Sequence, residues 1–255
     1  MSARLFWMGW LFHLKTLTNS LFFVLVSVLQ PIIFASIAFF MVESGSRSGT
    51  LLYVALGAGL MGIWSATLFG SGGAIQWQRW QGTLELMVGA PPPFVAVLLP
   101  LTVATSTIGI YSVVATLAWG RIFFGAPLDF VHPGELFVAL PATILSLGML
   151  GLLLASTFIL YRNANALSNM LEWPVLLVTG MLVPLSLLPT WAHPIAWVLA
   201  PTWGVRAIRE AALGGTPWPD IGMTLLLGGI YLTLGAIFLR HFEVRARRAA
   251  TLSLT

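Results

Sequence analysis

Long apolar runs separated by short polar segments dominate the pattern of hydrophobic and polar positions along the chain. Six runs can be traced, over residues 21–42, 51–75, 95–118, 136–161, 167–188 and 221–239. Each has about 20 residues, the length that a helix needs to cross roughly 30 Å of hydrocarbon. The pattern therefore predicts an all-α integral membrane protein, with six transmembrane helices in a single domain over residues 1–255 and both termini on one side.

Composition and charge agree with this class and indicate an orientation. Hydrophobic residues make up 58% of the chain and charged residues 8%, whereas a soluble domain has about 25% charged residues. Basic residues are more numerous on the side of the termini, with Arg4, Lys15, Arg79, Arg162, Arg240, Arg245, Arg247 and Arg248 there and Arg47, Arg121, Arg206 and Arg209 opposite. The positive-inside rule then makes both termini cytoplasmic. This charge distribution does not suggest a nucleic-acid partner.

The first 20 residues have the pattern of an interfacial helix. A broad apolar face would be formed by Phe6, Trp7, Trp10, Leu11 and Leu14, with Arg4 and Lys15 flanking it. Such a helix lies on a membrane surface, here the inner leaflet. The alternative is a plain cytoplasmic extension of the first spanning helix.

A polar insertion, residues 76–94, follows the second apolar run. Gly82 and Thr83 interrupt it, and the next five residues, LELMV, have a helical pattern. Glu85 would lie in the first turn, where the helix dipole favours an acid. Ala90 and three prolines that begin at Pro91 end this helix, because proline fixes φ and has no N–H to donate. We predict a short, stiff helix at the cytoplasmic face that moves as a lever.

Residues 189–219 differ from the apolar runs in their density of proline and tryptophan. They contain five prolines and four tryptophans, and indole rings favour the membrane interface. The apolar part, residues 194–200, is too short to span a bilayer. We predict short extracellular re-entrant helices before the sixth crossing, with Arg206 and Glu210 paired at i, i+4. That pair either takes part in gating or is a simple solvated ion pair.

The chain offers little enzyme chemistry. Its four histidines lie far apart, it has no cysteine, and it contains neither a G-x-S-x-G nucleophile elbow nor a P-loop. A match to G-x-G-x-x-G at residues 57–62 lies inside an apolar run, where Gly59 and Gly62 would let helices approach closely instead. We expect no catalytic residue, metal or cofactor here, and any nucleotide on another subunit. A membrane-embedded enzyme or scaffold would need polar catalytic groups that the sequence does not show, or a partner other than an ATPase.

Glu172 is the clear candidate for a charge inside the membrane. It lies about five residues into the fifth run, roughly 7 Å from its start. An intramembrane carboxylate either marks an ion path or has a structural role. The structural role is favoured, with the side chain extended to the inner interface or paired with Arg162. The alternative function is a proton-coupled secondary carrier or channel that uses Glu172.

Two segments give the chain a family resemblance. Six residues of the polar insertion match a family segment similar to E-R-x-x-G-T-L-E-x-L-x-x-x-P, with Gln78 in place of the first acid: Arg79, Gly82, Thr83, Leu84, Glu85 and Pro91. A second set lies at comparable positions near the C-terminus: Gly180, Pro184, Leu188, Pro189, Trp191, Pro201, Thr202 and Arg209. Over essentially its whole length the chain resembles the membrane permease subunits of type-2 ABC exporters, the drug-resistance, polyketide and lipid or polysaccharide export group.

The resemblance implies partners and a mechanism. Residues 76–94 would form a coupling helix that docks on an ATPase subunit, and an outer re-entrant gate would include Pro184, Pro189, Trp191, Pro201, Arg206, Arg209 and Glu210. Two permeases, identical or paralogous, would assemble with two ATPase subunits that bind ATP and Mg, in a bacterial or archaeal plasma membrane. ATP-driven closure would push the coupling and N-terminal helices and export a hydrophobic or amphiphilic substrate.

Overall fold

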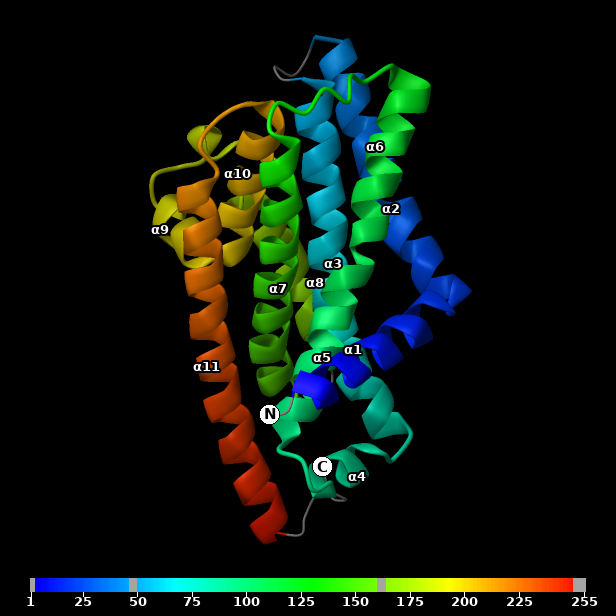
Figure 1. The fold of residues 1–255 in the computed structure, drawn as a ribbon, viewed down its shortest axis with the longest axis vertical. Helices are drawn as coiled ribbons and strands as arrows, with labels where there is room; N and C mark the ends of the chain where they lie inside the picture. The colour runs from blue at the N-terminus through cyan, green and yellow to red at the C-terminus, as the bar shows by residue number, and fades with distance from the viewer. Residues whose placement is uncertain (1–2, 46–49, 160–163, 250–255) are drawn as a thin grey trace.

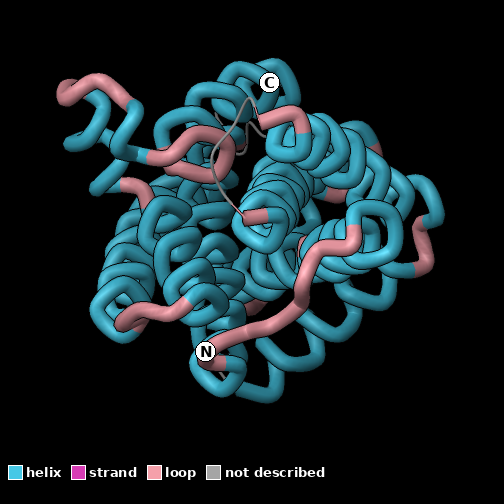
Figure 2. The backbone as a smooth tube through the Cα atoms, turned by 90° about the horizontal axis from the view of Figure 1, so that it is seen from above, coloured by secondary structure: helices cyan, strands magenta, loops and turns pink. Residues whose placement is uncertain are grey.

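The computed structural model describes residues 3–45, 50–159 and 164–249. Within these ranges the chain is helix or loop, without a strand (Figure 1; Figure 2). In chain order the elements are α1 (Ala3–Thr18), α2 (Leu21–Glu43), α3 (Leu51–Trp80), α4 (Leu84–Gly89), α5 (Phe94–Ile108), α6 (Ile110–Phe124), α7 (Pro133–Phe158), α8 (Ala164–Val178), η1 (Leu185–Leu187), α9 (Ala192–Val198), α10 (Ala200–Leu213) and α11 (Trp218–Ala249). The all-α prediction is confirmed for this part of the chain.

Five helical segments among the described residues are long and apolar enough to cross a membrane. They are α2, α3, α5 with α6, α7 and α11, and they correspond to five of the six predicted runs. The third run is interrupted at Gly109, between α5 and α6. A Cβ there would lie 2.5 Å from the Cα of Ile63 in α3, so only glycine allows this close packing.

The predicted fifth crossing is wrong as one continuous helix. α8 has 15 residues, a length of about 22 Å, which is less than the hydrocarbon thickness of about 30 Å. The helix ends because Gly180 has a φ of +82°, a left-handed conformation that does not continue an α-helix. The chain then forms η1, α9 and α10, which lie in the upper half of Figure 1.

α3 is the central helix of the bundle. In the apolar window of α3 89% of residues are buried, against 29% in α2 and 33% in α11. Glycines make this burial possible, because a Cβ on Gly59 would lie 2.7 Å from the Cα of Val113 in α6, and Gly62 faces Ser112 of the same helix. The helix-packing interpretation of the glycine motif at residues 57–62 is therefore confirmed.

α1 is a separate helix and not an extension of α2. Ser20 caps the N-terminus of α2, where its hydroxyl accepts from the N–H of Phe23. In Figure 1, α1 runs across the lower half of the bundle, and it packs on α5 with the Trp10 indole N–H donating to the Thr107 hydroxyl at 3.2 Å. Burial lowers the pKa of His13 from its ordinary value. The position of α1 on a membrane surface stays a prediction.

Different helices lie at the two ends of the bundle. α1, α4 and the C-terminal end of α11 lie in the lower half of Figure 1, whereas α9, α10 and the start of α11 lie in the upper half. The two ends of the described chain therefore lie in the same half, as an even number of crossings requires. Their assignment to the cytoplasm stays a prediction.

Candidate functional site

The predicted coupling segment begins with a tight turn at the C-terminal end of α3. The N–H of Gly82 donates to the Arg79 carbonyl at 3.1 Å, and the N–H of Thr83 donates to the Gln78 carbonyl at 2.9 Å. Gly82 has a φ of +67°. These two bonds and the left-handed glycine form a Schellman motif, which ends a helix and redirects the chain. The polar residues before Gly82 thus belong to α3 itself, which ends at Trp80 and not near residue 75 as the apolar run predicted.

Gln78 has a role in this turn that the sequence did not reveal. The Thr83 hydroxyl donates to its side-chain oxygen and, at 3.3 Å, to its carbonyl oxygen. Gln78 occupies the position of the family's acidic residue, and an amide oxygen is also an acceptor. Gln78 therefore accepts a hydrogen bond that fixes the start of α4.

Arg79 links α3 to the inner end of α7. Its Nη2 donates to the carbonyl oxygen of Ile159 at 2.7 Å, and Ile159 is the C-cap of α7. A guanidinium at this position satisfies a helix-end carbonyl and interacts favourably with the helix dipole. Arg79 therefore holds the inner ends of two helices together, in addition to any contact with a partner.

α4 presents one apolar face to the bundle and another outward. Leu84 and Val88 are buried, whereas the side chain of Leu86 is 73% exposed. Pro91, beyond the end of the helix, is exposed as well. The side chain of Glu85 lies outside the described residues, so its predicted role stays a prediction. The short helix predicted at Leu84 is present, and Leu86 is its exposed large apolar side chain.

Glu172 lies deep in the bundle and not at its inner surface. Its side chain is 4% exposed, and its Oε1 accepts from the Ser65 hydroxyl at 2.7 Å and from the Gln30 amide at 3.2 Å. Ser65 is halfway along α3. The prediction that Glu172 extends to the inner interface is wrong, because packing of α8 on α3 encloses the carboxylate. Pairing with Arg162 lies outside the described residues.

Arg209 is the most heavily engaged residue of the predicted outer gate. Its Nη1 and Nη2 donate to the carbonyls of Gly180 and Met181 at 2.7 and 3.1 Å. Its Cζ also lies 3.7 Å from the ring centroid of Tyr53 at the start of α3. Burial of a guanidinium requires such partners, because its desolvation is costly. Arg209 thus connects α10, the chain that leaves α8, and α3.

Gly57 of α3 provides the space for this contact. A Cβ on Gly57 would lie 2.5 Å from Nη2 of Arg209 and 2.7 Å from the carbonyl oxygen of Met181. No motif in the sequence pointed to Gly57 as part of the outer site. Only the position of α10 against α3 reveals the requirement for glycine.

Arg206 makes the ion pair that the spacing predicted and a second, shorter one. Its Nη2 lies 3.9 Å from Oε1 of Glu210, the predicted i, i+4 partner, but its Nε lies 3.3 Å from Oδ2 of Asp220 in α11. The Asp220 side chain is 4% exposed and that of Glu210 is 32% exposed. Arg206 therefore ties α10 to α11, and its contact with Glu210 is the weaker of the two.

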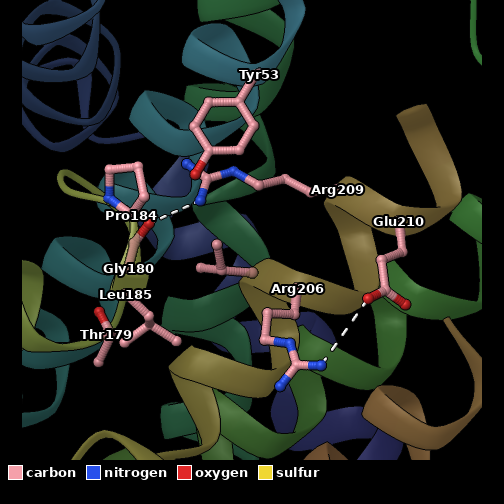
Figure 3. A pocket seen from close by; sticks show the side chains of 9 residues that line it. Tyr53, Thr179, Gly180, Pro184, Leu185, Arg206, Arg209 and Glu210 are labelled. Carbon is pink, nitrogen blue, oxygen red and sulfur yellow. Dashed lines mark hydrogen bonds and ion pairs between the residues drawn. The ribbon is translucent and has the colours of Figure 1, made fainter. Parts of the chain in front are cut away.

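A pocket of about 360 Å³ opens beside these residues. Figure 3 shows the side chains that line it: Tyr53, Thr179, Gly180, Pro184, Leu185, Val205, Arg206, Arg209 and Glu210. Four of the predicted outer-gate residues are among them. Trp191 is largely exposed, and Pro201 is buried in the first turn of α10, so these two positions and Pro189 are not part of the pocket lining.

The junction of α9 and α10 is fixed by a tyrosine from α11. The Tyr231 hydroxyl accepts from the N–H of Ala200 at 3.0 Å and donates to the carbonyl of Val198. α11 begins beside the start of α7, where the Trp218 indole donates to Glu135 at 3.0 Å. Tyr231 is 13 residues farther along α11, about 20 Å at the helical rise. The α9–α10 hairpin therefore extends well below the upper end of the bundle.

The described residues define the class of the protein: a multi-pass helical membrane protein with a pocket beside Arg206 and Arg209 at one end and a short exposed helix at the other. The sequence profile of the ABC-2 type transporter family matches residues 58–213, which is more than half of the chain. The chain belongs to this family and is a transporter membrane subunit of the permease type. No curated protein matches the sequence.

Proposed function

We propose that this chain is the membrane subunit of an ATP-driven exporter, assembled with a second permease and two separate ATPase subunits. The observation that carries the proposal is the course of α3, a single helix of 30 residues. At its inner end the Gly82 turn connects it to α4, and at its outer end Gly57 and Tyr53 contact Arg209. A helix of this length spans about 45 Å, so one rigid element connects the two ends.

The inner end of this pathway is the coupling helix. Leu84 and Val88 anchor α4 on the bundle, while Leu86 points outward and is available to a groove on an ATPase subunit. Closure of two ATPase subunits around ATP would displace α4. Because the Schellman turn is fixed by backbone hydrogen bonds, α4 and α3 move together.

The middle of the pathway passes the movement to α8. Ser65 of α3 donates to Glu172 of α8, and Gln30 of α2 donates to the same oxygen. Hydrogen bonds between helices in a membrane contribute about 0.6 kcal/mol on average, and here one carboxylate receives two. We regard Glu172 as a structural tie, since both donors are neutral, and we do not propose a proton-coupled carrier.

The outer end is the gate. We place α8 together with the chain that follows it through η1 as a broken fifth crossing of six, and the α9–α10 hairpin as a re-entrant element on the extracellular side. Movement of α3 would change the contact of Arg209 with the carbonyls of Gly180 and Met181, and so the shape of the pocket. Arginine, glutamate and apolar side chains share this lining, which suits an amphiphilic or hydrophobic substrate.

Purification of the chain from its native membrane in mild detergent tests the assembly. Co-purification of a P-loop ATPase, one per permease, is expected, and a second, different permease would indicate a heterodimer. Recovery of the chain alone, with transport that does not need ATP, would contradict the proposal.

Cysteine cross-linking then tests the docking surface. The chain has no cysteine, so a Leu86→Cys variant carries a single thiol. We expect it to cross-link to the ATPase subunit. Leu187→Cys is the matched control, because Leu187 is equally exposed, at 74% against 73%, but lies among the elements of the upper half. Equal yields from both variants would rule out α4 as the docking element.

A further inference from the structure

The junction between α4 and α5 is held by α11. The backbone N–H of Phe94, the first residue of α5, donates to Oε2 of Glu243 at 3.2 Å. The first N–H groups of a helix have no acceptor within the helix. Pro93 occupies the N-cap and offers no side-chain acceptor. Glu243 therefore supplies the cap from another helix, and its negative charge is favourable at a helix N-terminus.

An aromatic contact reinforces this cap. Phe94 is fully buried, and its ring centroid lies 6.4 Å from that of Phe242, the residue before Glu243. Two consecutive residues of α11 thus hold the residue that follows the three prolines. Because proline fixes φ in residues 91–93, holding Phe94 also restricts the position of α4.

α11 contacts the outer hairpin at its other end. Tyr231 bonds to Ala200 at the start of α10, and Asp220 lies beside Arg206 of α10. α3 also reaches α10, through Arg209. α3 and α11 therefore both connect α4 with α10. α3 does so from the start of α4, and α11 does so from the chain that follows α4.

We propose that Glu243 is a positioning residue that clamps the coupling helix to α11 and makes α11 a second path for its movement. The role in transport rests on the proposed function, whereas the clamp itself is a property of this chain. Since α3 holds the start of α4 and α11 holds the chain after it, displacement of α4 moves both helices together. Loss of the clamp would let α4 move without α11.

The mobility of α4 in the purified chain tests the clamp without any ATPase. A spin label on Leu86→Cys reports the motion of α4, and no native thiol competes for the label. We expect Glu243→Ala to increase the mobility of the label several-fold. Glu243→Gln keeps an oxygen acceptor, so the mobility of the label should stay near that of the parent chain. Glu43→Ala, which removes an exposed carboxylate in the other half of the bundle, is the control.

Unchanged mobility in Glu243→Ala, or an equal increase in Glu43→Ala, would overturn the clamp. Loosening by Glu243→Gln equal to that by Glu243→Ala would overturn the hydrogen-bonding role. In the assembled transporter, Glu243→Ala should lower the substrate exported per ATP hydrolysed at least several-fold, with ATPase binding retained. A loosened α4 with undiminished export per ATP would overturn the role in coupling. Failure to find an ATPase would leave the mobility result valid and would count against the proposed function alone.

Discussion

Gly57 of α3 and Arg209 of α10 share one space in the outer half of the bundle. A Cβ on residue 57 would lie 2.5 Å from Nη2 of the arginine, which also bonds to the chain that leaves α8. The first glycine of a motif that resembles a dinucleotide fingerprint is therefore the position that admits a guanidinium between helices. This contact is where the central helix reaches the outer pocket.

Gly57→Ala should destabilise the protein by about 1–3 kcal/mol, the usual range for overpacking a filled interior. The added methyl group displaces Arg209 from the carbonyls of Gly180 and Met181. Thermal unfolding in detergent measures the loss. Gly229→Ala in α11 is the control, because a Cβ there meets no atom within 4 Å.

The destabilisation caused by Gly57→Ala should depend on Arg209. In a chain that already carries Arg209→Ala, Gly57→Ala should cost clearly less than in the parent chain, since the group that it displaces is gone. Additive effects of the two substitutions would show that Gly57 acts through another contact.

Gly82→Ala should strain the turn between α3 and α4. A φ of +67° is left-handed, and a residue with a Cβ pays about 1–2 kcal/mol there. We expect lower stability and fewer molecules of substrate exported per ATP. Gly89→Ala is a matched control, since Gly89 ends α4 with open space around it and without a positive φ. Equal transport defects in both variants would contradict a specific role for the turn.

Glu172→Gln should leave export intact. A glutamine oxygen can accept from Ser65 and Gln30 as the carboxylate does, so the change in stability should stay within about 1 kcal/mol. Transport assays over a range of pH, together with thermal unfolding, measure both effects. Loss of transport in a folded Glu172→Gln variant, with ATP present, would favour the proton-coupled carrier.

Of the two acidic residues beside Arg206, Asp220 should contribute more to the stability of the protein than Glu210. Asp220→Asn removes the buried partner at 3.3 Å and should cost about 1 kcal/mol or more. Glu210→Gln removes a partly exposed partner at 3.9 Å and should cost less than about 0.5 kcal/mol. Unfolding of the two variants in parallel measures the difference. A larger effect of Glu210→Gln would restore the i, i+4 pair as the main interaction.

Local properties of the chain made part of this architecture predictable. The length and apolarity of the runs gave the long helices, because an α-helix satisfies every backbone polar group of an apolar segment within the segment itself. Gly82 and the prolines from Pro91 marked both ends of the short inner helix, since backbone conformation at glycine and proline depends little on distant contacts. The two family motifs pointed to a transporter subunit, and the match over residues 58–213 confirms it.

The sequence misled where an apolar run continued past the end of a helix. Residues 167–188 have the length of a span, yet α8 ends at Val178 and the chain folds toward α10. Hydropathy does not show where a helix ends inside an apolar run, because the residues on both sides of the break are apolar. The position of Glu172 was misjudged because the packing of α8 on α3, which buries its carboxylate, is not visible in the sequence.

Sequence alone thus determined the class of the protein, its long helices and the turn residues of its inner lever, all of which follow from apolar length and local backbone preference. Only the tertiary structure decided which distant groups meet. Arg206 pairs with Asp220 of α11, Arg209 occupies the space left by Gly57, Arg79 caps α7, and Glu243 caps α5. Residues at long separation come together through the packing of whole helices, and neither spacing nor composition encodes that packing directly.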